Sequence, residues 1–198
     1  IDRSRGLGDV YKRQIIHGGA NDDVDIKFIE SVLSKFNSGD ILVLQNEINN
    51  IKEIIKRAHH KKMKIVFNPA PFNKEILSYD LNKISTLILN QTEGEALSKE
   101  KKPDNILKVL NSKFKNTEII LTLGEKGSIY SFKDQLFKIE AHRADTVDTT
   151  GAGDTFIGYY VAGLISGMNK KENLNRASEA AAIATTKIGG AESIPRLN

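Results

Sequence analysis

The chain has 198 residues, of which 39% are hydrophobic and 27% are charged, and its formal net charge is +4. This length and composition are typical of one globular domain with a substantial core. The apolar runs are too short to span a bilayer, cysteine is absent, and no stretch forms a basic face. We therefore expect a cytoplasmic protein, with neither a membrane nor nucleic acid among its partners.

The first fourteen residues differ from the rest of the chain. IDRSRGLGDVYKRQ shows neither strand alternation nor helical periodicity, and it mixes glycine with arginine. We expect residues 1–14 to be an atypical head that is either disordered or non-native. Residues 15–198 are expected to form a single α/β domain.

Helices and strands are predicted to alternate along this domain. Helical spacing of apolar residues predicts a helix within 24–36, and short apolar runs predict buried strands further along. GSIYSF and LFKIEA predict an antiparallel hairpin at a sheet edge, and two helices over 153–167 and 171–188 close the chain. The remaining predicted strands are 40–45, 64–68, 86–90 and 118–123, and the remaining predicted helices are 50–62, a short one from about 92, and 103–115.

This alternation predicts a mainly parallel central sheet that helices cover on both faces. In such sheets, ligands bind beyond the carboxyl ends of the strands. The polar and glycine residues predicted at that edge are Glu47, Asn68, Asn90, Glu93, Gly124, the turn 151–153 and Asp154.

The segment DTTGAGDTF, residues 148–156, carries the strongest chemical signal. Gly151, Ala152 and Gly153 precede a predicted helix, where successive backbone N–H groups and the helix dipole favour an anion. Asp154 places a carboxylate beside that anion, as expected of a general base in phosphoryl transfer to an alcohol. The alternative is that Asp154 only caps the helix.

Two further groups follow predicted strands. Asn90 and Glu93 together offer oxygen atoms that suit water-mediated Mg²⁺ binding at nucleotide phosphates, or they begin an ordinary helix. Thr122, Gly124 and Gly127 belong to a glycine turn that fits a nucleotide lining without matching a Walker A loop.

The sequence resembles the ribokinase, or PfkB-like, family of sugar kinases. DTTGAGDTF is similar to the specific carboxy-terminal signature of that family, and NQTE (90–93) is similar to its N-x-x-E motif. NPAP (68–71), GGAN (18–21) and the tail KIGGAESIP (187–195) resemble the ribokinase subgroup. The resemblance runs from about residue 15 to the end and implies a three-layer ribokinase-like α/β sandwich.

The resemblance also implies roles for individual residues. It makes Asp154 the base that deprotonates the sugar hydroxyl, and it makes residues 151–153 the anion hole for the transferred phosphoryl group. Asn90 and Glu93 would organise Mg²⁺ and phosphates, Thr122, Gly124 and Gly127 would line ATP, and Glu47 would contact the sugar. An activating monovalent cation, usually K⁺, would be held by Asp148, Thr150, Ala184, Gly189 and Ser193.

One departure from the family pattern is large. Family members have roughly a third of their length before the point where this chain joins the pattern, including the lid over the sugar. We therefore expect a carboxy-terminal portion with an exposed sheet edge, from a parent for which the resemblance allows a homodimer. The expected reaction is ribose to ribose 5-phosphate. The alternatives are a fructokinase-like or nucleoside kinase, or a nucleotide-binding module without turnover.

Overall fold

A six-stranded sheet, ordered β1-β2-β3-β4-β5-β6, organises the computed structural model, which describes residues 18–196. Strands β1 to β4 run parallel, whereas β5 and β6 form an antiparallel hairpin at one edge. The strands are β1 Ile41–Gln45, β2 Lys64–Asn68, β3 Thr86–Asn90, β4 Glu118–Thr122, β5 Ser128–Phe132 and β6 Gln135–Ile139. The α-helices are α1 Ile26–Leu33, α2 Ile51–His60, α3 Gln91–Ser98, α4 Pro103–Lys113, α5 Ala152–Ile165 and α6 Lys170–Ala184.

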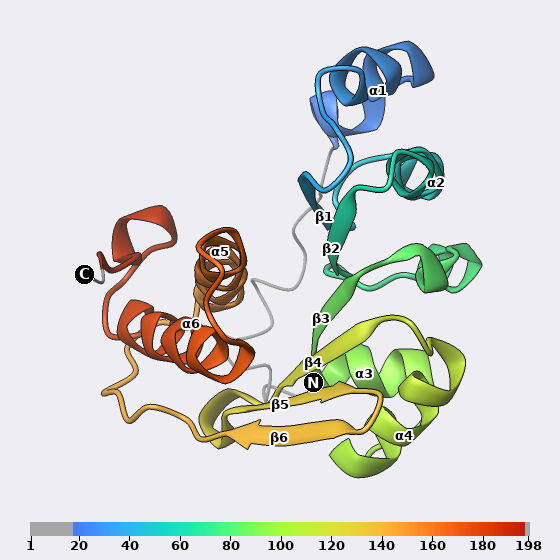
Figure 1. Cartoon of the computed structure of the whole chain (residues 1–198). Coiled ribbons are helices and arrows are strands. Elements are labelled where there is room, and N and C mark those ends of the chain that lie inside the picture. The colour runs from blue at the N-terminus through green and yellow to red at the C-terminus, as the bar shows by residue number, and fades with distance from the viewer. Residues whose placement is uncertain (1–17, 197–198) are drawn as a thin grey trace, which may run out of the picture.

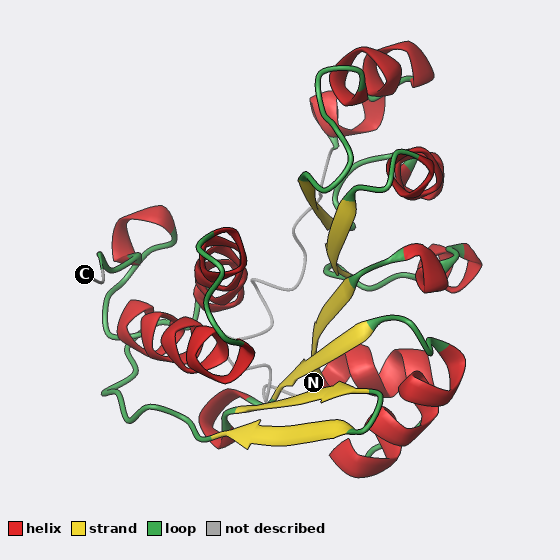
Figure 2. Cartoon of the chain, viewed as in Figure 1, coloured by secondary structure: helices red, strands yellow, loops and turns green. Residues whose placement is uncertain are grey.

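Helices cover the sheet on both faces, so the predicted three-layer architecture is confirmed. Figure 1 shows α1 to α4 on one side of the sheet and α5 with α6 on the other. The side chains of β4 alternate accordingly: Ile119 and Leu121 join the core with α1 to α4, and Ile120 joins the core with α5 and α6. Figure 2 shows the strands between these two helical layers.

The element boundaries follow the predictions closely where apolar runs are short and well bounded. The predicted strands 64–68 and 86–90 are confirmed without change. The last helix ends at Ala184 and not near residue 188, because the Thr185 carbonyl accepts backbone N–H bonds from Val147 and Asp148 instead of continuing the helix. The predicted head, residues 1–14, lies outside the described residues.

A polar cluster fixes α5 and α6 against the amino ends of the strands. Glu118, the first residue of β4, accepts hydrogen bonds from Lys170 Nζ at 2.8 Å and from the Tyr160 hydroxyl at 3.1 Å. Burial raises the pKa of Tyr160, so this phenol stays protonated and continues to donate. Because Tyr160 belongs to α5, the cluster holds the helix whose first turn carries Asp154.

Strand β1 forms the edge of the sheet opposite to the hairpin strand β6, and this edge is exposed. Among the described strands β1 pairs only with β2, and its Val43 side chain is 44% exposed. Val43 lies beside Val66 in the register and faces the same side of the sheet as α5. Within residues 18–196, no helix has both the length and the apolar character that a membrane crossing requires.

Candidate active site

Asp154 lies exposed in the first turn of α5, beside the carboxyl end of β1. Gly151 is the N-cap residue of this helix and has a φ of 74°, a backbone conformation that favours glycine. The first N–H groups of a helix have no intrahelical acceptor and favour an anion. In this turn, the Ala152 N–H donates to the Thr149 carbonyl at 3.3 Å. The structure therefore places an exposed carboxylate beside a helix amino terminus that no side chain caps.

The carboxylate of Asp154 does not cap its helix. Its Oδ1 atom accepts a hydrogen bond from Gln45 Nε2 at 2.7 Å, and the N-cap position has no side-chain hydrogen bond. The capping alternative for Asp154 is therefore wrong. The contact instead joins α5 to the end of β1 across 109 positions of sequence.

A second amide continues this contact toward β3. Gln45 Nε2 also donates to Asn68 Oδ1 at 3.2 Å, and Asn68 Nδ2 donates to the Ile88 carbonyl at 2.9 Å. The same Asn68 nitrogen reaches Glu93 Oε2 at 3.5 Å. The sequence predicts Asn68 at this edge without giving it a role, and it does not single out Gln45. The signal available for Gln45 was a polar residue closing an apolar strand.

Asn90 and Glu93 form a capping box at the start of α3. The backbone N–H of Glu93 donates to Asn90 Oδ1, and the backbone N–H of Asn90 donates to Glu93 Oε2, both at 2.9 Å. The ordinary helix start considered from the sequence is thus present. Glu93 is only 6% exposed, and burial raises the pKa of its carboxyl group, partly offset by the N–H groups of Asn90 and Asn68.

The oxygen atoms of Asn90 and Glu93 suit indirect binding of Mg²⁺ and not direct coordination. Asn90 Oδ1 and Glu93 Oε2 already accept hydrogen bonds, and the described residues contain no cluster of three histidine or acidic side chains that could hold a metal. Direct chelation by several protein carboxylates does not fit this arrangement, whereas binding through water and nucleotide phosphates does.

The predicted nucleotide turn connects β4 to β5. Thr122 lies beside Asn90 in the β3–β4 register, which places this turn next to the capping box. Gly127 has a φ of 81°, and a Cβ atom at this position would lie 2.0 Å from the Ile139 carbonyl oxygen. The close approach of Gly127 to the end of β6 therefore requires glycine. Gly124 begins the short 3₁₀ helix Gly124–Lys126 within the same turn.

The predicted cation residues lie around the loop before α5. Asp148 Oδ1 accepts from both the backbone N–H and the hydroxyl of Thr150, and Asp148 Oδ2 accepts from the Gly189 N–H. Ser193 is fully buried and donates to the Gly190 carbonyl at 2.7 Å. Ala184 ends α6 and is fully buried. The structure thus brings Asp148, Thr150 and Gly189 into direct contact.

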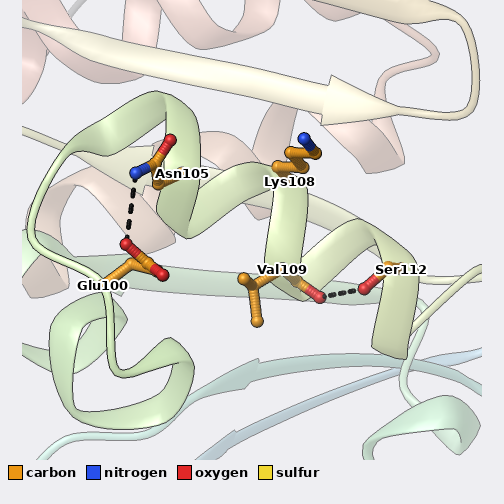
Figure 3. Close-up of a pocket in the computed structure, with 5 residues that line it drawn as sticks. All are labelled: Glu100, Asn105, Lys108, Val109 and Ser112. Carbon is orange, nitrogen blue, oxygen red and sulfur yellow. Dashed lines mark hydrogen bonds between the residues drawn. The ribbon is translucent and has the colours of Figure 1, made fainter.

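Two further features are the predicted sugar contact and a pocket along α4. Glu47, the predicted sugar contact, is exposed in the turn that follows β1. A pocket of about 370 Å³ lies along α4, lined by Glu100, Asn105, Lys108, Val109 and Ser112. Figure 3 shows that two of its polar side chains bond within the pocket, Asn105 to Glu100 and Ser112 to the Val109 carbonyl.

Comparison with known proteins identifies the family to which this arrangement belongs. A family model described as pfkB family carbohydrate kinase matches residues 11–197. The chain belongs to the pfkB family of carbohydrate kinases. The match includes the glycine turn with Asp154, the capping box and the turn between β4 and β5.

Individual relatives within this pfkB family are ribokinases. The ribokinase of Lactococcus lactis is 33% identical over 194 residues, which cover 97% of this chain and 63% of that protein. The solved ribokinase of Thermotoga maritima is 32% identical with a TM-score of 0.77, covering 91% of this chain and 61% of the other. Arabidopsis thaliana ribokinase, solved with ribose and ATP, is 26% identical with a TM-score of 0.76 over 91% of this chain and 61% of the other. The chain therefore spans about 60% of the length of these relatives.

Proposed function

We propose that this chain carries the nucleotide-binding and catalytic part of an ATP-dependent sugar kinase that phosphorylates the 5-hydroxyl of ribose. The observation that carries the proposal is the exposed Asp154 carboxylate beside the anion-binding turn of α5. Relatives that are 28–33% identical over the aligned residues and are named for a sugar include ribokinases and one deoxyribokinase. Fructokinases at 18% identity support the fold alone.

The residues support a direct transfer mechanism. The ribose hydroxyl gives its proton to Asp154 while its oxygen attacks the γ-phosphorus of ATP, and the bond from that phosphorus to the β-bridging oxygen breaks to release ADP. The N–H groups of residues 151–153 stabilise the charge that spreads over the transferred oxygens. Asn90 and Glu93 would hold Mg²⁺ through water, and Thr122, Gly124 and Gly127 would line ATP. Bound Mg²⁺ supplies charge neutralisation at the phosphates.

A monovalent cation such as K⁺ fits the second cluster of the proposed site. Asp148, Thr150, Ala184, Gly189 and Ser193 would surround it, and Asp148 supplies the negative charge. Asp148 shares a loop with the anion-binding turn, so a cation held there would stabilise that turn. Glu47 would contact the sugar from the end of β1.

The proposal is tested by ADP release from this chain with MgATP and K⁺. We expect release that depends on ribose and falls to background with Asp154→Asn. Separate incubations with deoxyribose and fructose test the two other acceptor classes. Release that is equal with every sugar, or that persists in Asp154→Asn, would contradict the proposal.

A second candidate is a nucleotide-binding module without turnover. It is favoured by the length of the chain, which spans 61–63% of its ribokinase relatives. In that case MgATP would bind, as measured by calorimetry, while no sugar would increase ADP release.

A further inference from the structure

Gln45 and Asn68 form a hydrogen-bonded bridge between two acidic residues of the site. The bridge runs from Asp154 Oδ1 through Gln45 Nε2 and Asn68 to Glu93 Oε2. Strand alternation explains why the two amides meet. Gln45 follows Val43 and Asn68 follows Val66 at spacing two, which places both amides on the sheet face that α5 covers. Gln45 and Asn68 are also direct partners in the β1–β2 register.

The acceptors on either side dictate the orientation of both amides. Gln45 Nε2 uses its two hydrogens on Asp154 Oδ1 and Asn68 Oδ1, at 2.7 and 3.2 Å. Asn68 Nδ2 uses its two hydrogens on the Ile88 carbonyl and on Glu93 Oε2. Flipping either amide would bring an oxygen against these acceptors, which is repulsive. The bridge therefore has one favoured hydrogen-bond direction.

Burial divides the bridge into a fixed end and a free end. Glu93 is 6% exposed and belongs to the capping box of α3, while Asn68 is anchored on the backbone of β3. Asp154 is exposed, and its Oδ1 atom accepts the hydrogen bond from Gln45. The bridge thus joins a buried, hydrogen-bonded carboxylate to an exposed one through the ends of β1 and β2.

We propose that Gln45 and Asn68 are positioning residues that hold the Asp154 carboxylate for proton removal and couple its orientation to Glu93. This inference rests on the proposed function, because it assigns Asp154 as the base. Its consequence is that a change at Glu93, on the Mg²⁺ and phosphate side, is transmitted to the base on the sugar side. Neither amide exchanges protons with the substrate in this role.

The first test follows the Asp154 side chain directly. The carboxyl ¹³C resonance of Asp154, assigned by its loss in Asp154→Asn, is recorded in the wild-type chain and in two variants. Gln45→Met keeps the length of the side chain and removes its donor, while Asn68→Ala removes a group that does not touch Asp154. We expect both variants to shift the resonance. Asn105→Ala is the matched control, because Asn105 bonds to Glu100 on α4.

Each result of this test decides the proposal. A shift with Gln45→Met and with Asn68→Ala, and none with Asn105→Ala, supports the bridge. A resonance that moves with neither variant, or with Gln45→Met alone, contradicts the bridge. The resonance can be measured without turnover. A chain that releases no ADP would therefore count against the proposed function, while the resonance would still test the bridge.

The second test separates positioning from nucleotide binding. In ribose-dependent ADP release, Gln45→Met should lower kcat roughly ten- to a hundredfold, as expected for a displaced catalytic group, and leave the KM for ATP unchanged. Gln45→Met and Asn68→Ala combined should lose less than the product of the separate losses, because they break one bridge. The exposed Gln135 at the hairpin provides the control Gln135→Ala. An active wild type with an equally active Gln45→Met would overturn the proposal and leave the kinase assignment intact.

Discussion

The backbone N–H of Gly189 donates to the Asp148 carboxylate at 3.1 Å and joins the loop after α6 to the turn before α5. Together with both Thr150 donors, this bond makes Asp148 the centre of two loops that lie 41 positions apart in sequence. The Thr150 hydroxyl, then the Gly189 and Thr150 backbone N–H groups, lower the pKa of Asp148 below its ordinary value of 3.8.

Removing this carboxylate should release Gly189. In Asp148→Ala, we expect faster hydrogen exchange at the Gly189 amide than in wild type, because the acceptor of that N–H is gone. Asp145→Ala, which removes an exposed carboxylate three residues earlier, serves as the control. Because the pKa of Asp148 is lower in the folded protein than its ordinary 3.8, this carboxylate also makes stability depend on pH. Its contribution is complete above pH 3.8 and is lost as pH falls through the lowered value. Unchanged Gly189 exchange in Asp148→Ala would refute the contact.

Asp154→Asn tests the base assignment. The substitution preserves side-chain size and leaves an oxygen that can still accept from Gln45, so the fold and ATP binding should be retained. Loss of the general base should lower kcat by roughly 10²- to 10⁴-fold. Calorimetric titration with MgATP is the control, and its affinity should match that of wild type. Wild-type turnover in this variant would remove Asp154 from the mechanism.

The buried carboxyl group of Glu93 predicts a pH-dependent stability. Because burial raises its folded-state pKa above the ordinary 4.5, the folded protein holds this proton more tightly than the unfolded chain. Stability contributed at this site is therefore highest at low pH and declines as pH rises from 4.5 through the raised value. Glu93→Gln removes the titration.

Thermal unfolding from about pH 4 to pH 8 measures this effect. The Tm of wild type should fall relative to that of Glu93→Gln as the pH rises across this window. Glu95→Gln, which removes a less buried carboxylate of α3, should follow wild type. A constant Tm difference between wild type and Glu93→Gln at every pH would show that Glu93 is not shifted in the folded state.

The contact between α5 and α6 depends on Gly163. A Cβ atom at Gly163 would lie 2.0 Å from Asn173 Oδ1, and Asn173 is fully buried with its Nδ2 donating to the Tyr160 carbonyl. Gly163→Ala should lower the free energy of unfolding by about 1–3 kcal/mol, as overpacking does in a closed core.

Gly158 supplies a matched control on the same helix. A Cβ atom there meets nothing within 4 Å, so Gly158→Ala should raise the free energy of unfolding by about 0.5–1 kcal/mol. Denaturant titrations of the two variants should therefore move in opposite directions. Equal effects would mean that the helix pair is not packed as closely as the structure shows.

The sequence predicted the sheet well because its strands are short apolar runs between clear stops. KIVFN ends before Pro69, and TLILN ends at the polar Asn90. Each apolar run therefore has clear limits, and these limits are the bounds of a buried parallel strand. The glycine turn before α5 was equally readable, since its residues are adjacent in sequence.

The hydrogen bond between Gln45 and Asp154 could not be predicted in the same way. It joins residues 109 positions apart, and their meeting depends on the strand order, on the face that α5 covers and on the axial position of that helix. The sequence likewise left open whether Asn90 caps α3, which the structure resolves through two reciprocal hydrogen bonds. Local patterns thus identified the groups, and tertiary packing determined their partners.

We propose above that Asp154 and the turn before it act in phosphoryl transfer to a sugar hydroxyl. Phosphorus NMR of this chain incubated with MgATP, K⁺ and ribose tests it most directly, because it separates sugar phosphate from inorganic phosphate. We expect a phosphomonoester signal that grows together with ADP, couples to the C5 protons of ribose and is absent with Asp154→Asn. Growth of inorganic phosphate alone, or a phosphomonoester signal that persists in Asp154→Asn, would contradict it.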